Sequence, residues 1–171
     1  MRTTLDHIRQ AIFNLLGNRV LQTRMLDLFS GSGALGIEAL SRGAAHVTFV
    51  DRSIFCIQAI QANLEALSLK TLVPSPFTLI RAEVLTGIRK VGREGLLFDL
   101  ILLDPPYGRD LARKSLIEIC RCAIVAARGL VVVEHAKRDP LPPQVEGKEM
   151  TLVLCRQQQY GDTALTFYER Q

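Results

Sequence analysis

Four residues at the end of an apolar segment have the composition of a reaction site. Asp104, Pro105, Pro106 and Tyr107 directly follow the apolar run 98–103. Consecutive prolines make a rigid turn, because proline lacks a backbone donor and holds the preceding residue away from the helical conformation. Backbone carbonyls and a carboxylate in such a turn can accept hydrogen bonds from an exocyclic NH2 group, and the Tyr107 ring can stack on a planar base. The tetrapeptide therefore indicates a site for a nucleobase amine, although its residue types also occur in ordinary strand-to-loop turns.

A glycine turn lies upstream, between the apolar segment 25–29 and the helix-like segment 34–42. Gly31 and Gly33 permit backbone conformations closed to other residues and let a ligand approach the main chain at the positive end of the following helix. The next apolar segment ends in Asp51, whose carboxylate can accept hydrogen bonds from both hydroxyls of a ribose. The spacing predicts a nucleotide-like cofactor.

Two cofactors are compatible with this turn. Gly31, Gly33 and Gly36 satisfy the dinucleotide fingerprint G-x-G-x-x-G, which would bind NAD. Asp27 precedes the turn, however, and a pyrophosphate would prefer no acid there, whereas S-adenosylmethionine carries an ammonium group and no phosphate. The pattern D-x-F-x-G-x-G, together with the tetrapeptide at Asp104, resembles that of S-adenosylmethionine-dependent amino-methyltransferases.

Apolar segments alternate with amphipathic ones along most of the chain, which predicts an α/β fold with a doubly wound, Rossmann-like sheet. Near the end, two alternating segments around a Tyr-Gly-Asp turn predict an antiparallel hairpin on this mostly parallel sheet. The predicted strands are 25–29, 46–51, 77–81, 98–103 and 129–134, with the hairpin at 148–156 and 163–168. The predicted helices are 5–16, 34–42, 53–67, 83–91 and 110–127.

The length of 171 residues, with 48% hydrophobic content, suits one domain at residues 1–171 that begins with a helical segment at 1–24. We expect a cytoplasmic protein, because no apolar run is long enough to span a membrane and the first residues lack the apolar core of a signal peptide. No metal site is predicted, since Cys120 and Cys122 have the wrong spacing for zinc. His135 is expected at the surface and outside the chemistry.

The basic residues are unevenly distributed. The net charge is +4, and arginine is far commoner than lysine, which suits contacts with phosphate groups. Segments 1–24 and 105–128, which flank the predicted site, are both rich in arginine and poor in acids. A solvated helix face explains any one of these arginines, but together they favour a polyanionic partner.

Nearly the whole chain resembles the bacterial 16S ribosomal RNA (guanine-N2)-methyltransferases of the RsmD type. Residues 2–14 are similar to that family's opening R-P-T-x-D-x-V-R-E-A-L-F-N, and residues 26–44 to its cofactor segment, while Asp104–Tyr107 and Tyr160–Thr163 match its remaining motifs. The resemblance implies methyl transfer from S-adenosylmethionine to the exocyclic N2 amine of a guanine in 16S ribosomal RNA. It also implies action on the 30S subunit or an assembly intermediate. The size of the chain and the absence of an obvious interface stripe predict a monomer.

The residue chemistry and the resemblance together assign roles to individual residues. Asp104, Pro105, Pro106 and Tyr107 are the expected catalytic residues. The expected cofactor-binding residues are Asp27, Phe29, Ser30, Gly31, Ser32, Gly33, Asp51, Arg52 and Glu83. The expected RNA-binding residues are Arg2, Asp6, Arg9 and Arg109. Family members usually carry a further basic hairpin ahead of the position that corresponds to Met1.

Two other functions use similar residues. A DNA methyltransferase acting on adenine N6 or cytosine N4 has the same acceptor chemistry, but no segment here is long enough for a separate DNA recognition domain. An NAD-binding module or a non-catalytic RNA-binding module is the alternative without methyl transfer, and the presence of Asp104 argues against the loss of catalysis.

Overall fold

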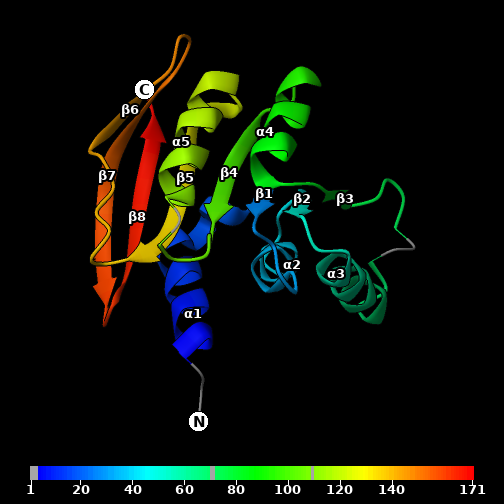
Figure 1. Ribbon diagram of the computed structural model, residues 1–171. Helices are drawn as coiled ribbons and strands as arrows, with labels where there is room; N and C mark the ends of the chain where they lie inside the picture. Colours follow the sequence, from blue (N-terminus) through cyan, green and yellow to red (C-terminus); the bar gives the residue numbers. More distant parts are fainter. Residues whose placement is uncertain (1–3, 70–71, 109) are drawn as a thin grey trace.

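The computed structural model describes residues 4–69, 72–108 and 110–171, which are arranged around one eight-stranded sheet (Figure 1). Five strands are parallel: β1 (Arg24–Leu28), β2 (His46–Asp51), β3 (Phe77–Arg81), β4 (Phe98–Leu103) and β5 (Val125–Ala136). Three antiparallel strands follow: β6 (Gln144–Glu146), β7 (Thr151–Tyr160) and β8 (Thr163–Arg170). The helices are α1 (Thr4–Leu16), η1 (Gly17–Val20, a 3-10 helix), α2 (Ala34–Ser41), α3 (Ile54–Ala66), α4 (Val84–Arg93) and α5 (Leu111–Cys122).

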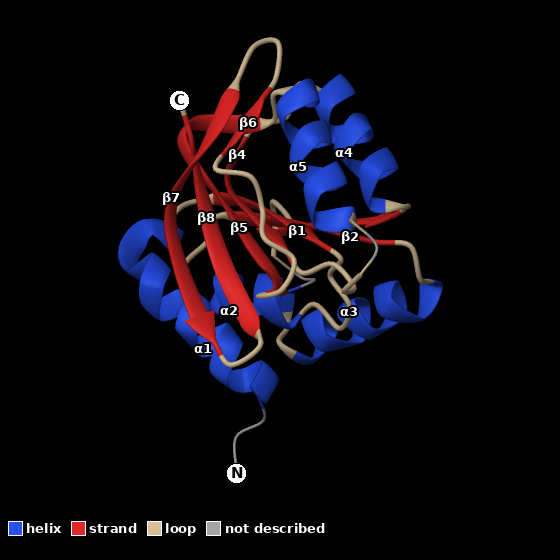
Figure 2. Cartoon of the chain, turned by 60° about the vertical axis from the view of Figure 1, so that its left-hand side comes forward, coloured by secondary structure: helices blue, strands red, loops and turns tan. Residues whose placement is uncertain are grey.

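The strand order is β3-β2-β1-β4-β5-β8-β7-β6, so the chain changes direction across the sheet between β1 and β4. Ligands of open α/β sheets bind outside the carboxyl ends of the strands at such a point. The predicted doubly wound, mostly parallel sheet with an antiparallel end is confirmed. β8 is inserted between β5 and β7, as Figure 2 shows.

The two faces of the sheet carry two separate cores, because successive side chains of a strand point to opposite faces. Leu26, Ile101 and Val131 pack in the core under α4 and α5. Met25 and Leu102 pack in the core on the other face, which α1, α2 and α3 cover (Figure 1). Within the part of the chain that the structure describes, no helix is long and apolar enough to cross a bilayer.

The helix predicted over 110–127 is shorter than expected. It ends at Cys122, and Ala123 adopts a left-handed conformation with φ 50°. The residues beyond it join the sheet as the beginning of β5, where Val125 pairs with Phe98 and an irregularity in the register follows. The prediction was wrong here because burial of apolar side chains in the sheet outweighs helix propensity, which is a weak preference.

His135 is buried, with 4% of its surface exposed, so the prediction of a surface histidine was wrong. Its Nδ1 lies 3.0 Å from the Asp139 carbonyl oxygen, and its Nε2 lies 2.7 Å from the Thr166 hydroxyl. The ring therefore joins β5 to β8 and to the loop that follows β5. The short edge strand β6 was also missed, since it follows the proline-rich segment 140–143.

Candidate active site

Three carboxyl groups lie at the carboxyl ends of three neighbouring strands. Asp27 belongs to β1, Asp104 follows β4, and Glu134 belongs to β5. The register pairs Leu28 with Leu103 and Leu103 with Val133, so these ends lie at the same level of the sheet. The alternation of side chains puts all three carboxyls on the face that α1 and α2 cover. This edge of the sheet is the predicted site.

The glycine turn after β1 leaves its main chain open to a ligand. Gly31 has φ 56°, a left-handed conformation that glycine adopts without strain, and a Cβ added to it would meet no atom within 4 Å. The Ser30 hydroxyl oxygen accepts the Val50 N–H at 3.0 Å and lies 2.6 Å from the Asp27 carbonyl oxygen. Ser30 thus fastens the turn to β1 and β2, while Gly31 borders empty space.

Asp27 lies behind the turn and is only 1% exposed. Its Oδ2 accepts the Gly36 N–H at 3.1 Å, in the first turn of α2. Burial raises the pKa of Asp27 well above its ordinary value, and the charges of Asp104 and Asp51 raise it further, while the bond from Gly36 opposes the shift. The carboxyl occupies the helix N-terminus that a pyrophosphate would need, which argues against the dinucleotide alternative.

The glycine at 36 has a packing role. A Cβ there would overlap the ring of Phe49 in β2. Gly36 is therefore required by the contact between α2 and the sheet. The third glycine of the dinucleotide fingerprint has the same packing role, so Gly36 does not distinguish the two cofactors.

Asp51 is held at the end of β2 by two backbone donors. Its Oδ2 accepts the Gly31 N–H at 3.0 Å, and its Oδ1 accepts the Ser53 N–H at 2.9 Å. A carboxylate oxygen has more than one acceptor position, so both oxygens can still receive hydroxyl groups. The orientation of Asp51 next to the glycine turn suits the predicted ribose contact.

A cavity of about 530 Å³ lies in front of these residues. Its wall combines apolar side chains, including Val84 and Leu85, with the acids Asp51 and Glu83. Arg52 and Glu83, both predicted to bind cofactor, form an exposed ion pair at 3.6 Å on its rim. The predicted residues that line this cavity are Phe29, Asp51, Arg52, Glu83, Asp104 and Pro106. An apolar slot beside carboxylates suits a nucleoside, with the ring in the slot and the hydroxyls on the acids.

A second cavity of about 200 Å³ lies on the other side of Phe29 and Asp104, which line both cavities. The turn residues Ser30, Gly31 and Ser32 and the α1 residues Leu5 and Arg9 also line it. Arg9 forms an ion pair with Asp6 at 3.0 Å. The two cavities share Phe29 and Asp104, and the second one borders the glycine turn.

The predicted RNA-binding residues are only partly placed. Arg9 lies at the second cavity, and Asp6 is held on the same helix by its ion pair with Arg9. Arg2 and Arg109 lie outside the described residues.

Among the predicted cofactor residues, Ser32 is exposed to solvent. Its carbonyl accepts the Asn63 side-chain N–H at 3.0 Å.

Asp104 is hydrogen-bonded to Glu134, and sequence reasoning missed this partner. Burial raises the pKa of both acids, that of Glu134 to about 7, with the charge of Asp104 and the hydrogen bond to it adding to the shift at Glu134. The hydrogen bond between the two acids raises the pKa of Glu134 and lowers the pKa of Asp104. We therefore take Glu134 as the proton donor in this bond. Glu134 could have been found from its position on the buried face of β5. That position points to Asp104 only once β5 is known to pair with β4.

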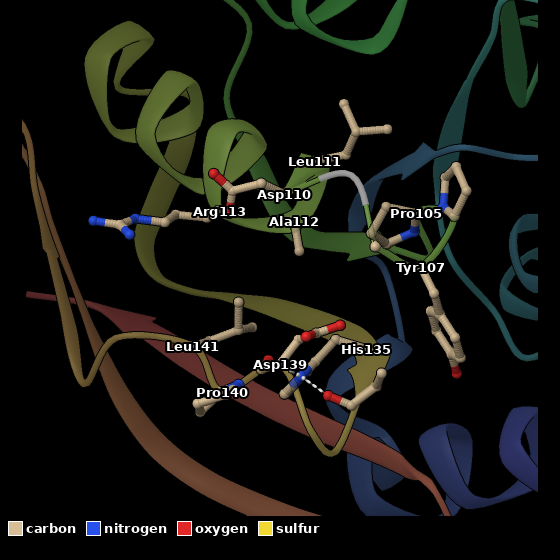
Figure 3. A pocket seen from close by; sticks show the side chains of 13 residues that line it. Pro105, Tyr107, Asp110, Leu111, Ala112, Arg113, His135, Asp139, Pro140 and Leu141 are labelled. Atoms are coloured by element: carbon tan, nitrogen blue, oxygen red, sulfur yellow. Dashed lines mark hydrogen bonds between the residues drawn. The ribbon is translucent and has the colours of Figure 1, made fainter.

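Tyr107 projects from the tetrapeptide with 46% of its surface exposed. Its hydroxyl lies 3.1 Å from the Thr163 hydroxyl at the start of β8. Pro105 is buried and Pro106 is exposed, so the turn is fixed on one side and open on the other. A third cavity of about 360 Å³ lies between the tetrapeptide, the start of α5 and the loop after β5 (Figure 3).

Known proteins with similar sequences identify the family of this chain. Residues 1–169 match the model of the family described as Conserved hypothetical protein 95. Ribosomal RNA small subunit methyltransferase D of Haemophilus influenzae is 31% identical over 141 residues, which cover 82% of this chain and 71% of that protein. The Escherichia coli K12 protein of the same name is 28% identical over 171 residues, covering 100% of this chain and 80% of that one.

Solved structures agree with the sheet described above. A conserved hypothetical protein of Streptococcus pyogenes superimposes with a TM-score of 0.81 at 31% identity, covering 94% of each chain. The yhhF protein of Escherichia coli also superimposes with a TM-score of 0.81, at 26% identity, covering 100% of this chain and 88% of that chain.

Proposed function

Since the chain belongs to the RsmD-type methyltransferase family, we propose that it transfers a methyl group from S-adenosylmethionine to the exocyclic N2 amine of a guanine in 16S ribosomal RNA. The observation that carries the proposal is the position of Asp104, which lines both cavities beside the glycine turn and is followed by an exposed aromatic ring at Tyr107. One domain at residues 1–171 would act as a cytoplasmic monomer, on the 30S subunit or an assembly intermediate.

The residues of the two cavities suit S-adenosylmethionine. Asp51 is oriented to accept ribose hydroxyls, the apolar wall with Glu83 suits the adenine, and the open main chain at Gly31 leaves room for the amino-acid part. Phe29, which lines both cavities, would separate the two parts of the molecule. When bound, this cofactor supplies an activated methyl group on a positively charged sulfur.

The chain's own contribution to the chemistry is mainly orientation. The lone pair of an aryl amine is delocalised into its ring, so the amine must be held with its nitrogen facing the methyl group. Asp104 and the Pro105 carbonyl would accept the two amino hydrogens, and Tyr107 would stack on the base. Asp104 would also stabilise the positive charge that develops on the nitrogen.

The proposal is tested by incubating the protein with labelled S-adenosylmethionine and, in parallel, unmodified 30S particles, free 16S RNA and duplex DNA, followed by nucleoside analysis. We expect N2-methylguanosine from a 16S substrate. Methylated adenine or cytosine in DNA would contradict the proposal in favour of a DNA amino-methyltransferase. RNA binding without transfer to any substrate would favour a non-catalytic module. Binding of NAD in place of S-adenosylmethionine would contradict the assignment of the cofactor.

A further inference from the structure

We propose that Glu134 is a positioning residue for the transfer reaction: its protonated carboxyl donates a hydrogen bond to Asp104 and holds that carboxylate in the orientation that receives the substrate amine. This inference rests on the function proposed above and adds a residue to its site. The chemistry requires one proton on the pair, because Glu134 must donate while Asp104 must accept.

The geometry of the sheet brings the two acids together. Asp104 comes directly after Leu103 and Glu134 directly after Val133, and these two residues are paired in register between the parallel strands β4 and β5. Both side chains line the cavity beside the glycine turn. Glu134 is 8% exposed, so the surrounding protein restricts it to a few conformations. A partner of this kind can determine the orientation of Asp104, for which Glu134 is the side-chain hydrogen-bond partner among the described residues.

Among the described residues, one acid and one basic side chain lie close to the pair. Asp27 on β1 contributes a nearby acid, since its own pKa is raised by the charge of Asp104. On β8, the residue paired with Glu134 is the apolar Leu165. The basic side chain on the cavity wall is Arg9 of α1, which is paired with Asp6. In these surroundings, two ionised carboxylates in contact would repel one another, so retention of one proton is favoured.

The shared proton has a consequence for the end of the reaction. When the amine nitrogen forms its bond to the methyl carbon, the methyl–sulfur bond breaks and its electron pair stays on sulfur, which leaves the nitrogen positively charged. The nitrogen then loses one proton to Asp104, and the pair, now holding two protons, returns one to water. Glu134 keeps its own proton throughout and acts only through Asp104.

The pH dependence of the rate provides the test. Deprotonation of Glu134 removes the donor, and its pKa is about 7, so the wild-type kcat should fall as the pH rises through that value. The Glu134→Gln variant carries an amide N–H that does not titrate, so its kcat should stay level over the same range. Glu134→Ala should lose about 10²-fold in kcat below that pH, with a smaller change in KM, because a misplaced reactive group costs about that much. The gap to the wild type should narrow above that pH, where the wild type has also lost the donor.

Glu118→Gln is the matched control. Glu118 is 7% exposed and lies on α5, where it pairs with Arg89 at 2.9 Å. Its replacement should keep the wild-type fall in kcat at high pH. If Glu134→Gln also keeps that fall, or if Glu134→Ala retains the wild-type kcat, the proposal is overturned.

A second measurement needs no RNA. Carbon-13 NMR of the side-chain carboxyls in the free protein should show Glu134 titrating near 7 in the wild type and at lower pH in Asp104→Asn, which removes the neighbouring charge. Methyl transfer combined with an ordinary Glu134 titration would overturn the inference and leave the proposed function intact. Coupled titration without methyl transfer to any substrate would overturn the proposed function and, with it, the role of Glu134 in a reaction.

Discussion

The hydroxyl of Tyr107 lies 3.1 Å from the hydroxyl of Thr163, so the tetrapeptide after β4 is tied to the first residue of β8. This bond crosses over β5, which lies between β4 and β8 in the sheet. It restrains a ring that is half exposed. The antiparallel part of the sheet therefore participates in the geometry of the candidate site.

Tyr107 is expected to act mainly through its ring. Tyr107→Ala should raise KM for the RNA substrate by about 10- to 100-fold, because stacking of a base on an aromatic side chain is worth about 1–3 kcal/mol. Tyr107→Phe keeps the ring and loses the bond to Thr163, so it should cost only a few-fold. Steady-state kinetics of methyl transfer measure both effects.

Thr163→Val is the control for the hydroxyl bond, because valine has the shape of threonine without its hydroxyl. It should match Tyr107→Phe, and the double variant should be no worse than either single one, since both remove the same interaction. Additive losses in the double variant would contradict a shared role.

Gly31 and Gly36 should respond differently to alanine. Gly31→Ala places a methyl group in the open space of the turn, so it should weaken S-adenosylmethionine binding while costing about 1–2 kcal/mol of stability for the left-handed backbone. Gly36→Ala should destabilise by at least about 1–3 kcal/mol, because its methyl group would overlap the Phe49 ring. Calorimetric titration and denaturant unfolding separate the two effects.

Gly95→Ala serves as the matched control for Gly31. Gly95 also has a positive φ, of 70°, and open space around its Cβ position, but it follows α4 at the opposite edge of the sheet. It should lose similar stability and bind the cofactor normally. Equal loss of cofactor affinity in both variants would show that Gly31 acts through the fold.

Replacement of Asp27 by asparagine should change the dependence of stability on pH. The folded-state pKa of Asp27 is raised, so its protonated form is favoured in the folded protein, and its contribution to stability is full below the ordinary value of 3.8 and is lost as the pH rises toward the raised value. The asparagine side chain of the variant cannot ionise, and its oxygen can still accept the Gly36 N–H. Thermal unfolding should show that the stability of Asp27→Asn increases relative to that of the wild type as the pH increases from acid to neutral.

If the stability of Asp27→Asn instead decreases relative to that of the wild type at neutral pH, the ionised carboxylate stabilises the fold. That outcome would require a positive partner for Asp27, and the described residues include no ion pair to it.

Arg9 is expected to contact RNA phosphate. Arg9→Ala should weaken RNA binding for all sequences alike and reduce the salt dependence of log K by about 1. Filter binding over a range of salt concentrations measures both. Arg93→Ala is the control, because Arg93 lies in the last turn of α4 at the opposite edge of the sheet. If the salt dependence of log K is unchanged in Arg9→Ala, Arg9 does not contact RNA phosphate and serves only in the ion pair with Asp6.

The first four strands were predictable because they are short, mostly apolar segments separated by glycine, proline and acid residues. Asp27, Asp51 and Asp104 stand at strand ends, where the topology brings them to one edge. Contacts that depend on register were not predictable, since a local pattern does not say which strands are neighbours. For this reason Glu134 was missed and the buried His135 was misjudged: their environments depend on β4 and β8, which are distant in sequence.

The insertion of β8 between β5 and β7 determines the order in which this sheet can be assembled. β7 precedes β8 in the chain, yet it reaches the rest of the sheet only through β8, with β6 paired outside it. During synthesis the parallel strands can associate first, but the edge of β5 keeps its backbone groups unpaired until residues 163–170 arrive. Those residues also bring Thr163 to Tyr107, so the unpaired edge of the nascent sheet closes in the same step that completes the candidate site around Tyr107.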